Sequence, residues 1–379
     1  MATMSLNNSE VMNNEVKNVE TSIRVGVTTT PNEVAWKGIS GCKSFTTPVT
    51  IDDAVEAVGA DYEVKKEHLV RVPDALVESI KNGTPYVGLN LTKENLITSH
   101  MATVRSDNDR TLGVVGAKYG VVQNAKAFEF IDIITSGQLG GEQQPIIETA
   151  GILGDGERMF VTAKMPNKLY IDGDNRDGIE DYILFTNTHD GTGAVTVLFT
   201  PIRVICQNTL NAALRGASNK LIFKHTSRVG EKLEWEKQEN MERAVAVLKM
   251  HEHFKQTFIQ ELYNLKEQKI SDMDSLLFSA KIMSTPAQVK LLQMANMNLD
   301  SVEEIGTRTK NNILALRDTI ESGIGQDNFK GTKLWLYNGL TSYLNNVRKF
   351  KSNEDRFNNI ALGGDANKKV QKAFDILAA

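Results

Sequence analysis

The chain has 379 residues, 41% hydrophobic and 24% charged, so it can bury a substantial core and has the composition of a soluble globular protein. Its formal net charge of −4 excludes attraction of the whole molecule to nucleic acid or to an anionic membrane, so any such binding needs a local basic patch. Its two cysteines form no CxxC pair, which argues against a disulfide framework or a cysteine zinc site and fits a reducing cytosol.

The first segment is a polar stretch. Residues 1–25 are rich in asparagine and lack the basic and apolar regions of a signal peptide, so we expect a disordered tail. No apolar run approaches the roughly 20 residues that span a bilayer. The sequence therefore predicts a cytoplasmic protein without a membrane partner.

The chain changes character near residue 230. Before this point short β-rich segments alternate with Gly, Pro, Asn and Asp, and after it the apolar residues recur with helical period. We therefore expect an α+β fold, in which residues 26–230 form a mixed or antiparallel sheet domain with hairpins and short helices. Residues 231–379 would form a helical region, and we find no internal repeat.

Two short helices are expected early in the first region. One begins at Ile51, with Thr50 as its N-cap. The second begins at about Asn124 and follows two strand segments around Gly116 and Gly120. These elements should pack against the hairpins that follow.

Two hairpins and a short helix complete the first region. One hairpin turns at residues 154–156, and a second joins residues 182–189 to residues 194–206 through a turn at 190–191. Pro201 in the return strand marks a bulge or an edge position. A helix over 209–215, capped by Asn208 or Thr209, and a strand over 220–225 follow.

The second region opens with a long amphipathic helix from about Glu231 to Glu267. Its expected buried stripe is Ala244, Val247, His251, Phe254, Phe258, Leu262 and Leu265. Capping boxes are expected at Thr285 with Gln288 and at Ser301 with Glu304. Further helices are expected at about 331–347 and 367–377.

Common catalytic motifs are absent from the sequence. It holds no phosphate loop, no GxGxxG after a strand, no GxSxG elbow and no HExxH helix. The acidic segment 172–181 fails the EF-hand pattern and is interpreted as a solvated turn. His251 is interpreted as a satisfied core or groove residue. We expect neither a metal nor a cofactor, and these absences favour a protein that is not an enzyme.

His189 and Asp190 form the most tempting catalytic pair. Adjacent residues on a strand point to opposite faces, so the two should not form a hydrogen-bonded dyad. We expect Asp190 to build the turn, and Asn187 and His189 to pair with nearby backbone.

A basic window lies at residues 203–230, which contain no Asp or Glu. Its cations are Arg203, Arg215, Lys220, Lys224 and Arg228. Such a cluster could neutralise phosphates and release their counterions. The alternative is a solvated sheet face whose acids lie elsewhere in the chain, and the sequence leaves both interpretations open.

A second basic segment, 331–351, interleaves aromatic and cationic residues. Aromatic side chains near Arg348, Lys349 and Lys351 could stack on single-stranded bases. Aromatics at helical spacing are more often core, and we favour a core position for Tyr337 with its leucine neighbours. Only residues 348–351 are expected to be exposed.

Several motifs together resemble a known family. They are "TLGVVGAKYGVVQNAKAFEF", "ETAGILGDGERMFVTAKMP", "LFTNTHDGTGAVTVLFTPIRVICQNTLNAAL", "FKHTSRVGEKL" and "GTKLWLYNGLTSYLNN", with "AWKGI" near Trp36. The chain resembles, from about residue 30 to its end, the phage and plasmid family called domain of unknown function 932. The resemblance implies a mobile-element setting beside anti-restriction and DNA-repair-like genes, and it supplies no catalytic residues. The family-motif candidates are Asn187, His189, Asp190, Gln207 and Asn208.

The leading hypothesis is a mobile-element protein that binds single-stranded DNA in recombination, replication or repair, without bond chemistry. Its phosphate contacts would be the cations of 203–230 and 348–351, and a loose likeness to Rad52-type annealing proteins suggests a homo-oligomer. The alternative is an anti-defence or regulatory protein that binds a host protein. A third hypothesis is a hydrolase, in which Asn187, His189 and Asp190 converge on a pocket with Arg203.

Overall fold

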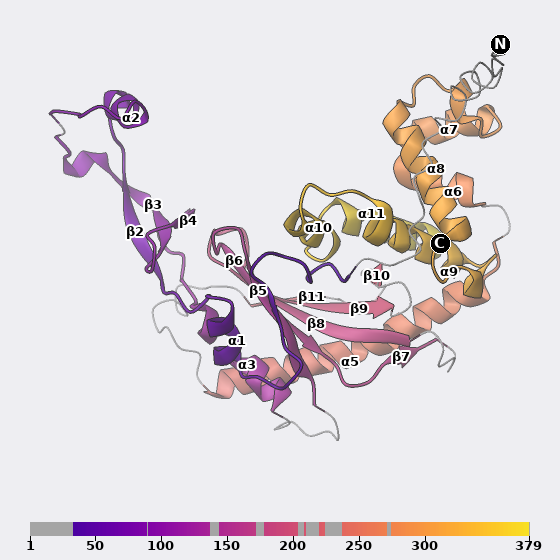
Figure 1. Cartoon of the computed structure of the whole chain (residues 1–379), viewed down its shortest axis with the longest axis horizontal. Coiled ribbons are helices and arrows are strands. Elements are labelled where there is room, and N and C mark those ends of the chain that lie inside the picture. Colours follow the sequence, from indigo (N-terminus) through magenta and orange to yellow (C-terminus); the bar gives the residue numbers. More distant parts are fainter. Residues whose placement is uncertain are drawn as a thin grey trace, which may run out of the picture.

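An antiparallel sheet forms the centre of the molecule (Figure 1). The computed structural model describes residues 33–88, 90–136, 144–171, 178–203, 208–209, 220–223, 237–270 and 274–378, so the tail expected at 1–25 lies outside them. The strand order is β1 (Lys43–Ser44), β5 (Ile146–Leu153), β6 (Arg158–Lys164), β8 (Gly178–Thr188), β9 (Val195–Arg203) and β10 (Asn208–Thr209), with β7 (Leu169–Tyr170) beside β8 and β11 (Lys220–Phe223) beside β9. The predicted α+β class is confirmed.

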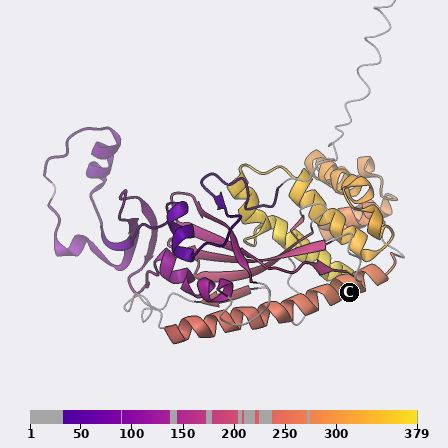
Figure 2. The ribbon, with the colours of Figure 1, turned by 60° about the horizontal axis from the view of Figure 1, so that its bottom comes forward.

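Helices cover both faces of this sheet (Figure 2). On one face lie α1 (Ile51–Ala57), α3 (Asn124–Thr135) and α5 (Lys237–Glu267); on the other lie α10 (Asn353–Ile360) and α11 (Asp365–Ala378). Because side chains alternate along a strand, neighbouring residues of β8 enter different layers. Phe185 packs against Phe130 of α3 at 5.8 Å between ring centroids, whereas Tyr182 meets Trp36 on the opposite face at 5.2 Å.

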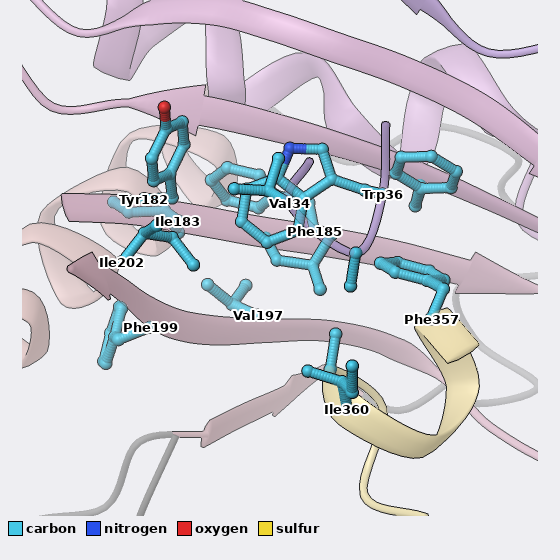
Figure 3. Packing of buried hydrophobic residues seen from close by; sticks show 14 of the residues in the cluster. Val34, Trp36, Tyr182, Ile183, Phe185, Val197, Phe199, Ile202, Phe357 and Ile360 are labelled. Atoms are coloured by element: carbon cyan, nitrogen blue, oxygen red, sulfur yellow. The ribbon is translucent and has the colours of Figure 1, made fainter. Parts of the chain in front are cut away.

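One large hydrophobic core joins the two regions that the sequence distinguished. Phe199 of the sheet lies 5.5 Å from Phe254 of α5, and Phe160 lies 4.8 Å from Phe357 of α10. Figure 3 shows Phe199 and Phe357 among the residues of this core. The seven positions predicted for the buried stripe of α5 are all buried. The change near residue 230 is therefore a change of secondary structure within a shared core. The start predicted at Glu231 lies outside the described residues.

The remaining C-terminal helices pack against one another. They are α6 (Ser275–Met283), α7 (Pro286–Met294), α8 (Thr307–Ser322) and α9 (Lys333–Ser342), which continues into a π-helical turn η4 (Tyr343–Val347). Of these, α8 and α9 also contribute to the large core. Short 3-10 turns lie at Lys93–Asn95, Leu299–Ser301 and Asp327–Phe329. A second, smaller core cluster joins α6, α7 and α8. No helix within the described ranges is both long and apolar enough to cross a membrane.

An arm extends from the central sheet at its α1 end (Figures 1 and 2). It consists of the antiparallel strands β2 (Val64–Val70), β3 (Leu96–Arg105) and β4 (Thr111–Gly116), with α2 (Asp74–Lys81) near its tip. At the base of the arm, Thr103 donates a hydrogen bond to the carbonyl of His189 at 2.7 Å. Arg105 donates to the carbonyl of Asp155 at 2.7 Å, so the arm is tied to two hairpin turns of the central sheet.

Several local predictions are confirmed. Thr50 caps α1 in a capping box, α3 begins at Asn124, and Thr285 caps α7. The hairpins turn at 154–156 and after β8 as expected. Pro201 pairs with β8 on one side only; on the other, the described pairings cover 195–198 and 202–203, which fits its missing N–H.

Two local predictions are wrong, and a third falls largely outside the described residues. Residues 117–123, around Gly120, form no strand, because the chain turns there toward α3. Ser301 ends a 3-10 turn, and α8 begins at Thr307 after Gly306. Asn208 and Thr209 pair with β9 as a short strand, and the helix that one of them was expected to cap falls at residues 210–219, which lie outside the described chain.

Candidate functional site

A polar groove lies among α8, η4 and α11. Its volume is about 450 Å³, and its lining contains four cations and one carboxylate. The lining residues are Met283, Arg308, Asn311, Asn312, Ala315, Tyr343, Val347, Arg348, Lys349, Asp365 and Lys369. We call this the basic groove. It brings together Arg348 and Lys349, which were predicted from the sequence as phosphate contacts, and two cations that were not predicted, Arg308 and Lys369.

Three elements position the cations of the basic groove. Arg308 lies in the first turn of α8, and the groove residues that follow it at positions 311, 312 and 315 recur at helical spacing on the same face. Arg348 and Lys349 follow directly where η4 ends. Asp365 and Lys369 are four residues apart in α11, so they share one side of that helix.

The single carboxylate of the basic groove is shared by two cations. Asp365 accepts from Arg348 at 2.8 Å and from Lys369 at 2.8 Å. Burial alone would raise the pKa of the Asp365 carboxyl, but these hydrogen bonds outweigh it and hold the pKa below its ordinary value. Arg308 and Lys349 are exposed, and neither has a carboxylate within 4.0 Å in the described part of the chain. The groove therefore keeps an excess of positive charge.

The aromatic residues near the basic groove do not offer faces for bases. Tyr337 is fully buried, which confirms its predicted core position, and Trp335 is 8% exposed. Tyr343 is also buried, with its hydroxyl 3.3 Å from Asn312 Oδ1. Burial raises the pKa of Tyr343, although Arg348 and Arg308 oppose the change. The Arg348 guanidinium covers Phe350 at 5.0 Å. The stacking interpretation of this segment is therefore not supported.

A second, smaller pocket lies on the central sheet. Its volume is about 260 Å³, and strands β6, β8, β9 and β11 form its floor. Among its lining residues are Arg158, Thr186, Thr196 and Lys220. Lys220 is the one cation of the predicted window that the described structure places in a pocket, and we call this the sheet pocket.

The other members of the basic window are not brought together in the described structure. Arg203 is 1% exposed, donates to the Gly325 carbonyl at 2.9 Å and stacks over Phe329, so its position does not support the predicted phosphate contact. The remaining window cations and one motif residue lie outside the described residues: Arg215, Lys224, Arg228 and Gln207. Lys351 is exposed but does not line the basic groove.

Two of the family-motif residues, Asn187 and His189, lie in a buried polar cluster on the α3 side of β8. His189 is fully buried, with Nε2 2.9 Å from Asn124 Oδ1 and 3.4 Å from Asn187 Nδ2. Asn187 donates to the carbonyl of Val122 at 3.0 Å, which confirms backbone pairing for Asn187, whereas His189 uses a side-chain partner. These contacts fasten β8 to the start of α3.

Asp190 builds the turn after β8, as expected. Its carboxylate accepts from the Thr192 amide at 2.9 Å and from the Thr192 hydroxyl at 2.7 Å. Asn187, His189 and Asp190 line neither the basic groove nor the sheet pocket, so the hydrolase hypothesis gains no support. His251, as predicted, is satisfied in the core, with Nε2 2.6 Å from Asp181 Oδ2. No group of three metal-ligating side chains suited to a metal ion occurs among the residues that the structure describes.

Sequence reasoning missed Arg158, Arg308 and Lys369. Arg308 carried a usable signal, because polar residues follow it at helical spacing on α8. Lys369 pairs with Asp365 four residues earlier, which is also visible in the sequence. Arg158 had no comparable signal, since its pocket also needs residues far along the chain, such as Leu362 and Asn367.

The comparisons with known proteins agree with the motif resemblance. A family model described as Domain of unknown function (DUF932) matches residues 111–362, which is more than half of the chain. No curated protein and no solved structure matches the chain. The matched range contains Arg158, Arg308, Arg348 and Lys349 and ends just before the Asp365 and Lys369 side of the basic groove.

Proposed function

The chain belongs to the DUF932 family, and from this premise we propose that it binds single-stranded DNA through the basic groove. It acts in recombination, replication or repair of a phage or plasmid, in the cytoplasm of a bacterial host, and does no bond chemistry of its own. The observation that carries this proposal is the groove itself, which gathers four cations around one carboxylate in a chain of net charge −4.

Phosphate neutralisation is the physical basis of the proposed binding. Each phosphate that a cation neutralises releases condensed counterions, which favours binding at low salt without reading the bases. Arg308 and Lys349 are exposed and have no close carboxylate in the described structure, so they can meet a phosphate without breaking an ion pair. Because no aromatic face is presented, the groove should show little preference for base identity.

The shape of the basic groove favours a single strand over a duplex. The groove has a volume of about 450 Å³ and is recessed between α8, η4 and α11. A duplex is stiff over roughly 150 base pairs and would touch only the rim, whereas a flexible single strand can lower a phosphate between the cations. Single strands should therefore bind more tightly at equal salt.

The test is a titration of fluorescent single-stranded and duplex DNA over a series of salt concentrations. We expect single-strand binding whose logarithm falls linearly with log salt, and its loss in Arg308→Glu with Lys349→Glu. If neither DNA binds wild-type protein at low salt, the proposal is refuted. Light scattering of the same samples tests the associated expectation that the protein forms a homo-oligomer.

The arm favours a second candidate function, binding to a host defence protein. It projects from the body and exposes apolar side chains near its tip, including Ile80 at 69% and Val87 at 91% exposure. Monomeric proteins rarely leave grouped apolar side chains in water without a partner. Ile80→Ser with Val87→Ser should abolish a host complex and leave DNA binding unchanged; an unaltered complex would rule out the arm as its contact surface.

A further inference from the structure

The sheet pocket is built by side chains that one face of the sheet brings into register. Arg158 of β6 lies opposite Thr188 of β8, and Thr186 lies opposite Thr196 of β9. Leu198, two residues further along β9, lies opposite Lys220 of β11. Since residues directly opposite in a sheet share a face, two cations and several threonine hydroxyls are gathered on one surface.

Arg158 is the central charge of this pocket. Its Nη1 lies 3.4 Å from Asn358 Oδ1. In the described structure Nε is buried without a hydrogen-bond partner, whereas Nη2 has no partner and remains accessible to solvent. No carboxylate lies within 4.0 Å of it in the described structure; the acids Asp190 and Glu354 act on it from a greater distance. Burial lowers the pKa of Arg158 despite both acids, although an arginine stays charged at neutral pH. The guanidinium is thus a half-buried cation without a counterion in contact.

Thr186 adds a hydroxyl that is ready to donate. It is only 4% exposed, and within the described ranges its hydroxyl has no hydrogen-bond partner. The hydroxyl oxygen is not sealed from solvent. Its accessible surface therefore opens into the sheet pocket, which Thr186 lines. A polar group in this position gains a hydrogen bond only when a ligand arrives.

The segment after α10 closes the pocket from the other side. Ala361, Leu362 and Gly363 lie over the sheet, and Asn367 of α11 adds an amide. Among the described residues that line the pocket, none is Asp or Glu. A guanidinium, hydroxyls and an amide can all donate hydrogen bonds to the oxygens of an oxyanion, and no carboxylate in this lining repels it.

We propose that the sheet pocket binds a phosphate monoester, with Arg158 and the Thr186 hydroxyl as its principal donors. The cavity of about 260 Å³ suits a phosphate carried on a sugar-sized group, either a free nucleotide or the terminal phosphate of a DNA strand. This site is separate from the basic groove and does not depend on DNA binding there.

Two variants and one matched control test the proposal. Thr186→Val removes the hydroxyl and keeps the shape, and Arg158→Met removes the charge. Thr200→Val is the control, because Thr200 lies on the same face of β9 as Thr196 and has a sealed, unpartnered hydroxyl, but it does not line the pocket. Both valine variants should fold as well as wild type, since neither hydroxyl has a protein partner to lose.

Calorimetric titration with a deoxynucleoside 5′-monophosphate should detect binding to wild type and to Thr200→Val. Thr186→Val should bind roughly 10- to 100-fold more weakly, the loss of one hydrogen bond to a charged group, and Arg158→Met should not bind. Oligonucleotides with and without a 5′-phosphate separate the two sources: a preference for the phosphorylated strand assigns the strand end. If wild type binds no monophosphate and ignores the 5′-phosphate, or if Thr186→Val binds as Thr200→Val does, the proposal is overturned.

The outcome is separable from that of the basic groove. Arg308→Glu with Lys349→Glu should leave monophosphate binding intact while it removes the salt-dependent binding of single strands. Loss of both activities in that variant would show that one site serves both ligands and would overturn the separate pocket.

Discussion

Neutralising the two unpaired cations of the basic groove should flatten the salt dependence of DNA binding. Arg308→Gln with Lys349→Gln removes two of four cations and breaks no ion pair in the described structure. For single strands the slope of log affinity against log salt is about −0.7 per neutralised phosphate, so four contacts give about −2.8 and two give about −1.4. Between 50 and 200 mM salt, wild type should then lose about 50-fold in affinity and the variant about 7-fold.

Fluorescence anisotropy with a labelled oligonucleotide measures both slopes directly. The control is Lys290→Gln with Lys330→Gln, which removes the same charge from exposed lysines that do not line the groove. This control should keep the wild-type slope. Equal slopes in wild type and in the groove variant would refute the reasoning, because the cations of the groove could then not be the groups that displace counterions.

Three further predictions concern the fold. Asp181→Ala leaves His251 buried without its carboxylate and should lower the free energy of unfolding by about 3–5 kcal/mol, measured by urea denaturation. Gly339→Ala would place a Cβ 2.7 Å from Ile320 Cα and should cost about 1–3 kcal/mol, whereas Gly306→Ala, with nothing within 4 Å, should be neutral by the same assay. Burial raises the pKa of Asp132, with neighbouring acids adding to the effect, so this carboxyl stabilises the fold at low pH and that contribution is lost as pH rises through its folded pKa. Asp132→Asn should therefore raise Tm at pH 7, and the gain should shrink toward pH 4; a gain independent of pH would contradict the assignment.

Local patterns predicted most of the fold because they depend on neighbouring residues. The apolar spacing of α5 selected its buried side, and the turn residues at 154–156 marked their hairpin. Thr285 and Gln288 marked a helix start by their own hydrogen bonds. The projecting arm escaped prediction, since alternation along β2 and β3 does not reveal whether anything packs beside them.

The candidate sites were predictable only in part, because they depend on distant contacts. Arg203 looked like an exposed cation, yet its guanidinium is bonded to a carbonyl 122 residues away. Arg348 and Lys349 were identified from their own segment, but the groove also needs Arg308 and Lys369 from two other helices. The distribution of charge along the sequence cannot reveal which distant residues lie together in the fold.

The shared core has a consequence for how the molecule comes apart. Phe199 of the sheet and Phe254 of α5 cover each other, as do Phe160 and Phe357, so neither half of the chain can bury its apolar face alone. The two halves should therefore melt in one cooperative transition. A cut near residue 230 would yield fragments that regain structure only when mixed, and any ligand held by the C-terminal helices would stabilise the sheet by the same free energy.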